Sequence, residues 1–213
     1  MNAQTAKKNL LECIMSGNRT KAIDILDGWA KRFNYGRAVS DILEPVLEDI
    51  GNLWMGEKIS LAAGYLAGKI AEETLLHAHE HEDAVPETRG PVVIGNVEDD
   101  YHGLGRRMVC IFLKTAGWSV VDLGNDVAAS DFVDSALANG SKIIAVSSMM
   151  FTTAGNIINI RREIDKRDLS DRIRLAVGGA VFKIRPGLVA EVGGDGTAAN
   201  AVGAPELMER LWR

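Results

Sequence analysis

VVIGNVEDDYHGLGRRMV, residues 92–109, is the stretch that decides the fold. An apolar run over 92–97 leads into three acidic residues, then a histidine at position 102, then glycines at 103 and 105. A short apolar run of this kind is typical of a strand buried on both faces of a parallel sheet. The residues after Gly105 have helical spacing. The stretch therefore predicts a strand, a glycine-rich loop that contains His102, and a helix.

Downstream of this unit, short apolar runs keep alternating with helical patterns. Further strands are expected over 119–123, 143–147 and 173–177, with a short final strand near 197–199. The alternation predicts an α/β fold with a doubly wound, five-stranded parallel sheet of the Rossmann-like or flavodoxin-like type. In such a sheet, ligands bind at the carboxyl ends of the strands. The expected helices lie near 105–116, 130–138, 154–166 and from 205 onward.

Upstream, the pattern is helical. Four amphipathic segments separated by short loops predict a four-helix bundle, and Ser60 is the expected N-cap of the fourth. Pro45 should either kink the third segment, 37–54, or mark its first turn. The charged, proline-bearing stretch EHEDAVPETRGP, 80–91, has the composition of a linker. We therefore predict a helical cap domain over 1–88 and an α/β domain over 89–213.

Composition argues against several classes of protein. The net charge of −5 and the lack of a basic stripe argue against a nucleic-acid binder. No apolar run reaches the length of a membrane span, and the first residues lack a signal-peptide core. Cys13 and Cys110 lie in amphipathic patterns and form no CxxC motif. These features predict a reduced, cytoplasmic protein.

The glycine-rich loop is open to three chemical interpretations. A dinucleotide site would use Gly103 and Gly105, with Asp122 at the end of the next strand. However, Met108 stands where the third glycine belongs, and the acidic residues 98–100 would repel a pyrophosphate.

A hydrolytic triad could combine His102 and Asp100 with Ser147 or Thr153, although the chain has no G-x-S-x-G elbow. In the third interpretation, His102 is a metal ligand and Asp100 fixes its tautomer by accepting the other ring N–H. A single histidine cannot hold a bare metal ion, so the metal would arrive inside a macrocycle. Glycines on either side of Leu104 would allow a bulky ligand to approach the backbone.

Three motifs resemble the signature of cobalamin-binding domains. Residues 100–105 resemble its D-x-H-x-x-G motif, residues 147–149 its S-x-L motif with Met for Leu, and residues 178–179 its G-G motif. Forty-one residues separate the first motif from the second, and 28 separate the second from the third. This spacing matches that of the family. The resemblance implies a corrinoid protein with cobalamin, such as methylcobalamin, as its cofactor.

The resemblance implies a role for each matching residue. His102 would coordinate cobalt from below in the base-off, His-on mode, Asp100 would accept the imidazole N–H, and Thr153 would extend this relay. Other residues would line the slot for the nucleotide tail or pack at the corrin edge. These are Tyr101, Gly103, Leu104, Gly105, Ser147, Met149, Gly178, Gly179 and Phe182.

The helical region resembles the cap that precedes the cobalamin domain in methionine synthase, in methyl-carrying corrinoid proteins and in cobalamin photoreceptors. The match runs through ILEPVLEDIGNLWMGEKIS, 42–60. It implies that Trp54 and Tyr65 face the upper side of the cobalt. Photoreceptors carry W-x9-E-H, and here Gly64 and Tyr65 stand at the last two positions. This departure argues against light sensing.

The resemblance therefore implies a methyl-carrying corrinoid protein with little turnover alone. Its partners would be the corrinoid, the methyltransferases that load and unload it, and a reductive activase. The alternative is a non-catalytic, cobalamin-dependent sensor or cobalamin-holding protein. Fold and motif do not identify the methyl donor, because that choice is made by partner proteins.

Overall fold

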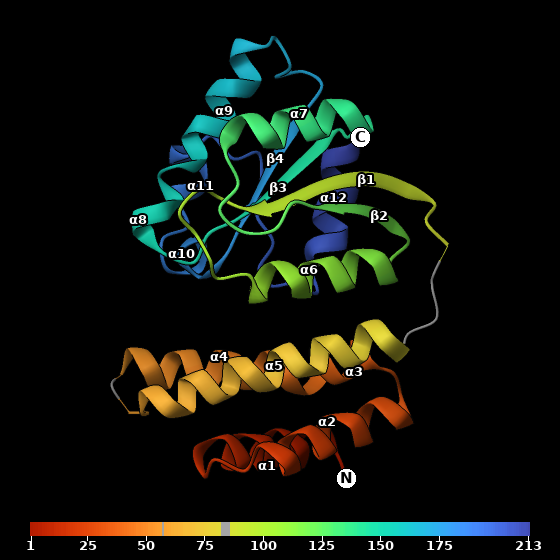
Figure 1. Cartoon of the computed structure of the whole chain (residues 1–213), viewed down its shortest axis with the longest axis vertical. Helices are drawn as coiled ribbons and strands as arrows, with labels where there is room; N and C mark the ends of the chain where they lie inside the picture. Colours follow the sequence, from red (N-terminus) through yellow and green to blue (C-terminus); the bar gives the residue numbers. More distant parts are fainter. Residues whose placement is uncertain (57, 82–85) are drawn as a thin grey trace. The chain divides into compact units, whose positions relative to one another are not determined.

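The computed structural model describes residues 1–56, 58–81 and 86–213, and the chain divides into two compact units. The first unit is Met1–Ala84 and is helical, and the second is Val85–Arg213 and contains the sheet (Figure 1). Our predicted domain boundary after residue 88 stays a prediction. Among the helices of the described residues, none is both long enough and apolar enough to cross a bilayer.

The helical unit begins each of its first three helices with asparagine. The side chains of Asn2, Asn18 and Asn34 each accept a hydrogen bond from the backbone N–H three residues later, at 2.9, 3.1 and 2.7 Å. Such N-caps satisfy amide groups that have no partner within the helix. Ser60 caps the last helix in the same way, accepting from the Ala63 N–H at 3.2 Å, as predicted. The helices are α1 (Ala3–Met15), α2 (Arg19–Arg32), α3 (Tyr35–Ala38), η1 (Val39–Leu43), α4 (Glu44–Met55) and α5 (Leu61–His81).

Pro45 marks the first turn of α4, which was one of its two predicted roles. The expected third helix is built from α3, the π-helical segment η1 and α4. The Glu44 N–H donates to the Val39 carbonyl, a bond that spans five residues and defines the π-helix. Proline has no N–H to donate, so it is tolerated in the first turn of a helix, where that N–H would have no partner. The π-helical segment ends just before α4, and Pro45 therefore lies in the first turn of α4.

The α/β unit is a doubly wound parallel sheet of four strands, β1 (Arg89–Asn96), β2 (Trp118–Asp122), β3 (Ile143–Ser147) and β4 (Arg174–Gly178). Their order in space is β2-β1-β3-β4, and every neighbouring pair is parallel. The helices are α6 (Leu104–Thr115), α7 (Ala129–Asn139), α8 (Phe151–Ala154), α9 (Ile157–Lys166), α10 (Ala180–Ile184), α11 (Leu188–Glu191) and α12 (Ala204–Trp212). In Figure 1, α7 and α9 lie on one side of this sheet, and α6 and α12 lie on the other.

Successive side chains along each strand point to opposite faces of the sheet and pack into two separate cores. Val93 faces the core that it shares with Phe132 of α7 and Ile160 of α9. Val92 faces the other core, with Leu113 of α6 among its members. Burial on both faces explains why the strands are continuous apolar runs rather than alternating ones.

The predicted fifth strand near 197–199 was wrong. Beside β4 the chain forms an isolated bridge between Ala176 and Gly196, just before the predicted strand. The Val177 N–H donates to the Gly196 carbonyl at 2.9 Å, and the Asp195 N–H donates to the Leu175 carbonyl at 2.7 Å. The small residues that follow, Thr197 to Ala199, remain partly or fully exposed. They bury too little apolar surface to extend the ladder.

Strand register brings three chain segments together at the carboxyl edge of the sheet. Asn96, the last residue of β1, pairs with Ser147 of β3, and Ser147 pairs with Gly178 of β4. The loops that leave these residues contain all three motifs identified in the sequence. The topology therefore places the motifs side by side.

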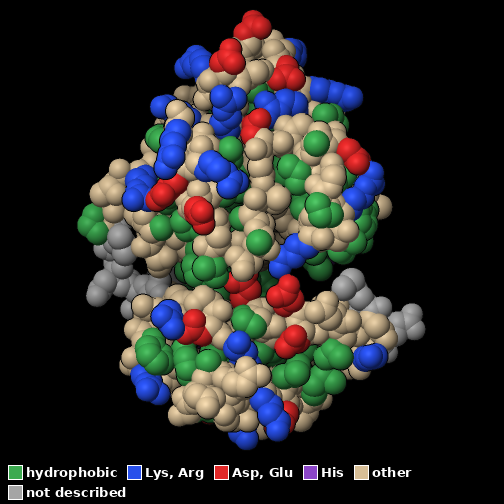
Figure 2. Space-filling model, turned by 180° about the vertical axis from the view of Figure 1, so that it is seen from behind, with side chains coloured by type: hydrophobic (Ala, Val, Ile, Leu, Met, Phe, Trp, Pro, Cys, Tyr) green, Lys and Arg blue, Asp and Glu red, His purple; other side chains and the backbone are tan. Residues whose placement is uncertain are grey.

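Charged side chains are mixed over the visible face of the α/β unit. Lys and Arg side chains lie there among Asp and Glu side chains (Figure 2). Such interspersed charge differs from the single-sign stripe that is typical of nucleic-acid interfaces.

Candidate functional site

The loop between β1 and α6 is held by the loop that follows β2. Asp99 has a φ of 68°, and its N–H donates to Asp126 Oδ1 at 2.8 Å. The Tyr101 hydroxyl donates to the other oxygen of Asp126 at 2.5 Å. This hydrogen bond raises the pKa of Tyr101. Asp tolerates the left-handed conformation better than most residues, so Asp99 and Asp126 together fix the start of the loop that contains His102.

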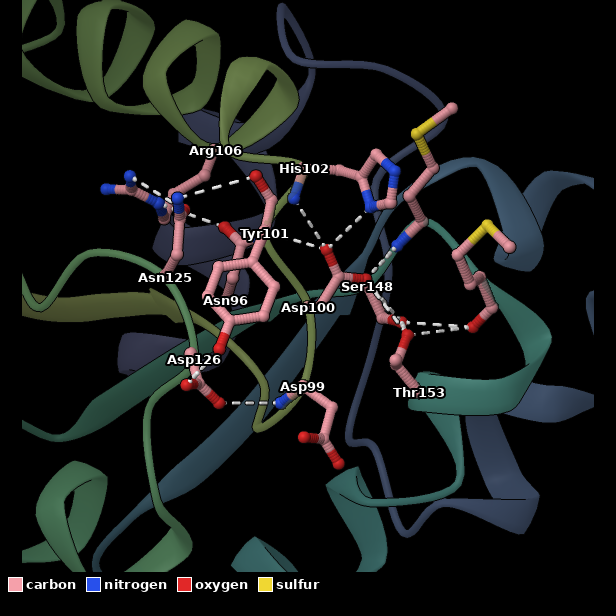
Figure 3. A network of polar contacts seen from close by, with 12 residues as sticks. Asn96, Asp99, Asp100, Tyr101, His102, Arg106, Asn125, Asp126, Ser148 and Thr153 are labelled. Carbon is pink, nitrogen blue, oxygen red and sulfur yellow. Dashed lines mark hydrogen bonds and ion pairs between the residues drawn. The ribbon is translucent and has the colours of Figure 1, made fainter.

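Asp100 is the centre of the site, and its carboxylate oxygen Oδ1 binds His102. The Asp100 side chain has no exposed surface, whereas the His102 side chain is 49% exposed. Asp100 Oδ1 accepts from the His102 backbone N–H at 2.9 Å and lies 3.2 Å from His102 Nδ1. Figure 3 shows that the second ring nitrogen points away from the carboxylate. In a neutral imidazole, the nitrogen that faces a carboxylate is the one that carries the proton, and this tautomer leaves the lone pair of Nε2 available to a ligand.

The second oxygen of Asp100 is bound by the chain that follows β3. It accepts from the Met149 N–H at 2.8 Å, from Thr153 Oγ1 at 3.0 Å and from Ser148 Oγ at 3.2 Å. The two hydroxyls also contact each other at 2.8 Å. Thr153 therefore contacts Asp100 directly, and its role in a relay stays a prediction.

Ser148 is a member of this network that sequence reasoning missed. Its buried hydroxyl reaches Asp100, whereas Ser147 ends β3 and its predicted place beside the nucleotide tail stays a prediction. The S-x-L pattern passes over this middle residue, so the motif carried no signal for it. Side chains of successive strand residues point to opposite faces, and the register of β3 was needed to choose between the two serines.

The pKa of Asp100 is set by opposing effects. Burial raises it, but the N–H groups of His102 and Met149, the Thr153 hydroxyl and the Asn96 amide lower it, and the net result is a fall from 3.8 to about 2. Hydrogen bonds to a carboxylate favour its charged form. Asp100 therefore remains ionised at neutral pH and is a permanent acceptor for His102.

The depressed pKa predicts a pH-dependent contribution to stability. Because the folded pKa lies below the unfolded one, the contribution is complete well above pH 3.8 and is lost as pH falls toward 2. It amounts to about 2 kcal/mol. Urea unfolding of wild type and Asp100→Asn at pH 6 and pH 2.5 should show a smaller loss in the variant. An equal loss in both proteins would contradict the assignment.

The glycines of the motifs fall into two groups. A Cβ on Gly103 would lie 2.7 Å from Asn125 Oδ1, and one on Gly179 would lie 1.9 Å from the Ser148 carbonyl oxygen. At Gly179 the obstacle is fixed backbone, so the fold itself requires glycine there, whereas at Gly103 the Asn125 side chain would have to shift. A Cβ on Gly105 or Gly178 would meet no atom within 4 Å. Their backbone is open, as the approach of a bulky ligand requires.

The other predicted residues of this unit differ in burial. Tyr101 and Met149 have exposed side chains, and Leu104 is the first residue of α6. Phe182 is 3% exposed and belongs to the core.

The two predicted cap residues lie in the helical unit. Trp54 is part of α4, and its side chain lies outside what the structure describes. Tyr65 is part of α5 and is exposed, with the Lys69 ammonium 5.6 Å from its ring centroid. Their approach to a cofactor stays a prediction.

Residues 90–206 match the family described as the B12 binding domain. The chain belongs to the B12-binding family. It is 33% identical to trimethylamine corrinoid protein 2 of Methanosarcina acetivorans over 145 residues, which cover 68% of this chain and 64% of that protein. It is 29% identical to the dimethylamine corrinoid protein of Methanosarcina barkeri over 161 residues, which cover 76% and 73% of the two chains.

Structural comparison gives the same fold. The monomethylamine corrinoid protein of Methanosarcina barkeri superposes with a TM-score of 0.83 at 23% identity, covering 99% of this chain and 100% of that one. In the methanol:cobalamin methyltransferase complex of the same organism, a chain matches with a TM-score of 0.54 at 21% identity, covering 95% of this chain and 77% of that one. The chain spans 64, 59 and 63% of the lengths of three trimethylamine relatives that it matches in sequence.

The residues of this B12-binding chain fit the cofactor of its family. Cobalamin carries its cobalt in a corrin ring, to which an imidazole nitrogen can bind, and it has a nucleotide tail that needs room against the protein. His102 presents a free imidazole nitrogen at the carboxyl edge of the sheet, and Asp100 fixes its orientation. Gly105 and Gly178 supply open backbone at the same edge. The fit rests on the chemistry of the donor and on the open backbone.

Proposed function

We propose that this chain is a methyl-carrying corrinoid protein that binds cobalamin in the base-off, His-on mode. The observation that carries the proposal is the Asp100–His102 pair, with Nδ1 held at 3.2 Å from the carboxylate and Nε2 open. An imidazole oriented in this way is a more basic metal ligand than a free one. The names of the relatives, trimethylamine and dimethylamine corrinoid proteins, support methylated amines as the source of the methyl group.

Cobalamin, when bound, supplies a cobalt centre that accepts a methyl group and gives it up to a second substrate. The protein's residues hold the lower ligand and manage its proton. Asp100 keeps the proton of His102 on Nδ1. Because the pKa of Asp100 is about 2, the carboxylate stays charged at neutral pH and remains an acceptor for His102. Ser148 and Thr153 steady Asp100 from its other side.

The open backbone at Gly105 and Gly178 would admit the nucleotide tail, with Met149 and Leu104 beside it. The helical unit, which we place at residues 1–88, would cap the upper face through Trp54 and Tyr65. Partner methyltransferases would load and unload the cobalt, and a reductive activase would restore it after oxidation. The chain alone should therefore show little turnover.

The test uses the cobalamin-loaded protein, reduced to the cob(I) form. It is mixed with purified trimethylamine or dimethylamine methyltransferase and the matching amine, and the visible spectrum of methylcobalamin is followed. We expect methyl transfer only when enzyme and amine are both present. Stoichiometric cobalamin binding without transfer from either enzyme would overturn the amine assignment and favour the sensor or cobalamin-holding alternative. Failure to bind cobalamin would overturn the whole proposal.

A further inference from the structure

Arg106 is a buried cation next to the site, and neither the motifs nor the proposed mechanism uses it. It lies in the first turns of α6 and is 6% exposed. Its guanidinium pairs with Asp122 at the end of β2, donates from Nε to Asn96 Oδ1 at 3.0 Å, and donates to Asn125 Oδ1 at 3.4 Å. Burying a charged group is costly unless it is paired and hydrogen-bonded. Arg106 is therefore held in one conformation by three partners, two of which, Asn96 and Asn125, are drawn in Figure 3.

Arg106 determines which way the Asn96 amide points. Asn96 has no exposed surface, so water cannot satisfy its polar atoms. A guanidinium can only donate hydrogen bonds, so the atom of Asn96 that faces it must be the carbonyl oxygen. The amide nitrogen then faces Asp100 and donates to Oδ1 at 3.1 Å. The flipped amide would set an NH2 group against the guanidinium and an oxygen against the carboxylate, and both contacts are repulsive.

The Asp100 oxygen that accepts a hydrogen bond from Asn96 is the same oxygen that binds His102. Asp100 Oδ1 accepts from Asn96 on one side and from the backbone and ring nitrogens of His102 on the other. With Met149 and Thr153 bound to Oδ2, the Asn96 bond fixes the plane of the carboxylate. Rotation of this plane would move the acceptor away from Nδ1, because hydrogen bonds weaken steeply with misalignment.

We propose that Arg106 is a positioning residue for the cofactor ligand, acting through Asn96 and Asp100 on the imidazole of His102. This inference rests on the proposed role of His102 as the cobalt ligand. Polar groups beyond the direct ligands of a metal commonly set ligand orientation and metal affinity. Arg106 also ties this arrangement to Asp122 and Asn125, which belong to the end of β2 and to the loop after it.

The test compares Arg106→Met and Arg106→Lys with a matched control, Arg161→Met. Arg161 is also a largely buried arginine, at 14% exposure, but it pairs with Asp195 and the Gly193 carbonyl. Each protein is labelled with ¹⁵N-histidine and loaded with cob(II)alamin. In the electron paramagnetic resonance spectrum, a ¹⁵N-imidazole ligand splits each cobalt line into a doublet, whereas the cofactor's own ¹⁴N base gives a triplet. Cobalamin affinity and urea unfolding are measured on the same samples.

We expect Arg106→Met to lower cobalamin affinity about tenfold and to shift the spectrum from doublet toward triplet. Arg106→Lys should lie between this variant and wild type, because it keeps the charge but loses the fork of donors. Arg161→Met should lose stability and keep the doublet. If Arg106→Met does not fold, Asn96→Ser replaces it, because serine is too short to bridge Arg106 and Asp100. An unchanged doublet and affinity would overturn the inference, whereas a wild-type protein without the doublet would overturn the ligand role of His102 instead.

Discussion

His102→Ala is expected to weaken cobalamin binding on the order of a hundredfold and to remove the imidazole signal from the spectrum of bound cob(II)alamin. Groups that merely support a metal ligand change affinity by about 10–100-fold, so loss of the ligand itself should reach the upper end of that range. The lower position would then be filled by water or by the cofactor's own base. The measurement is a titration followed by visible absorption, together with the spectrum of the ¹⁵N-histidine-labelled protein.

The fold should tolerate this substitution. The His102 side chain is 49% exposed, and within the described part of the chain its ring contacts the Asp100 carboxylate. Surface substitutions change stability by about 0.5 kcal/mol or less, so the urea midpoint should remain close to that of wild type. A large loss of stability would mean that the imidazole is structural.

A second histidine provides the control. His77 of α5 also lies beside a carboxylate, with Nδ1 3.1 Å from Asp27 Oδ1, but it belongs to the helical unit. His77→Ala should leave the doublet intact. The chain has four histidines. If His102→Ala kept the doublet, one of the other three would be the ligand, and the assignment of His102 would be wrong.

The sequence predicted the architecture where local pattern and topology agree. Apolar runs and glycine-rich loops identified strands β1 to β4 and the placement of the motifs at one edge of the sheet. The same reasoning predicted the pairing of Asp100 with His102, since residues two apart in a tight loop can share one hydrogen-bonding network. The fifth strand near 197–199 was expected from the alternation of strands and helices, but the chain forms an isolated bridge at Gly196 instead of a ladder.

The parts of the site that escaped prediction depend on packing between distant segments. The sequence analysis assigned no role to Arg106, which lies in the predicted helix, or to Asn96, which lies in the predicted strand. Their burial and their mutual hydrogen bond follow from how α6 packs against β1. A sequence pattern shows the type of each residue, but it does not show that a carboxylate, an amide and a guanidinium are joined in a buried chain.

Gly179→Ala is expected to destabilise the protein by about 3 kcal/mol or more, combining backbone strain with overpacking. Gly179 has a φ of +121°, and an added Cβ would lie 1.9 Å from the Ser148 carbonyl oxygen. That carbonyl is backbone and cannot swing aside. Displacing Ser148 would also disturb its hydroxyl contact with Asp100. Urea unfolding of the variant should show the loss even without cofactor.

The neighbouring substitution separates the needs of the fold from those of the cofactor. A Cβ on Gly178 meets no atom within 4 Å, so Gly178→Ala should leave stability within about 0.5 kcal/mol of wild type. A Cβ on Gly105 also meets no atom within 4 Å. Because alanine has the higher helix propensity, Gly105→Ala should raise the stability of α6 by up to about 1 kcal/mol. If the nucleotide tail lies against these two positions, both variants should bind cobalamin more weakly. The cofactor, and not the fold, would then be the reason for glycine at 105 and 178, whereas undiminished binding by both stable variants would place the tail elsewhere.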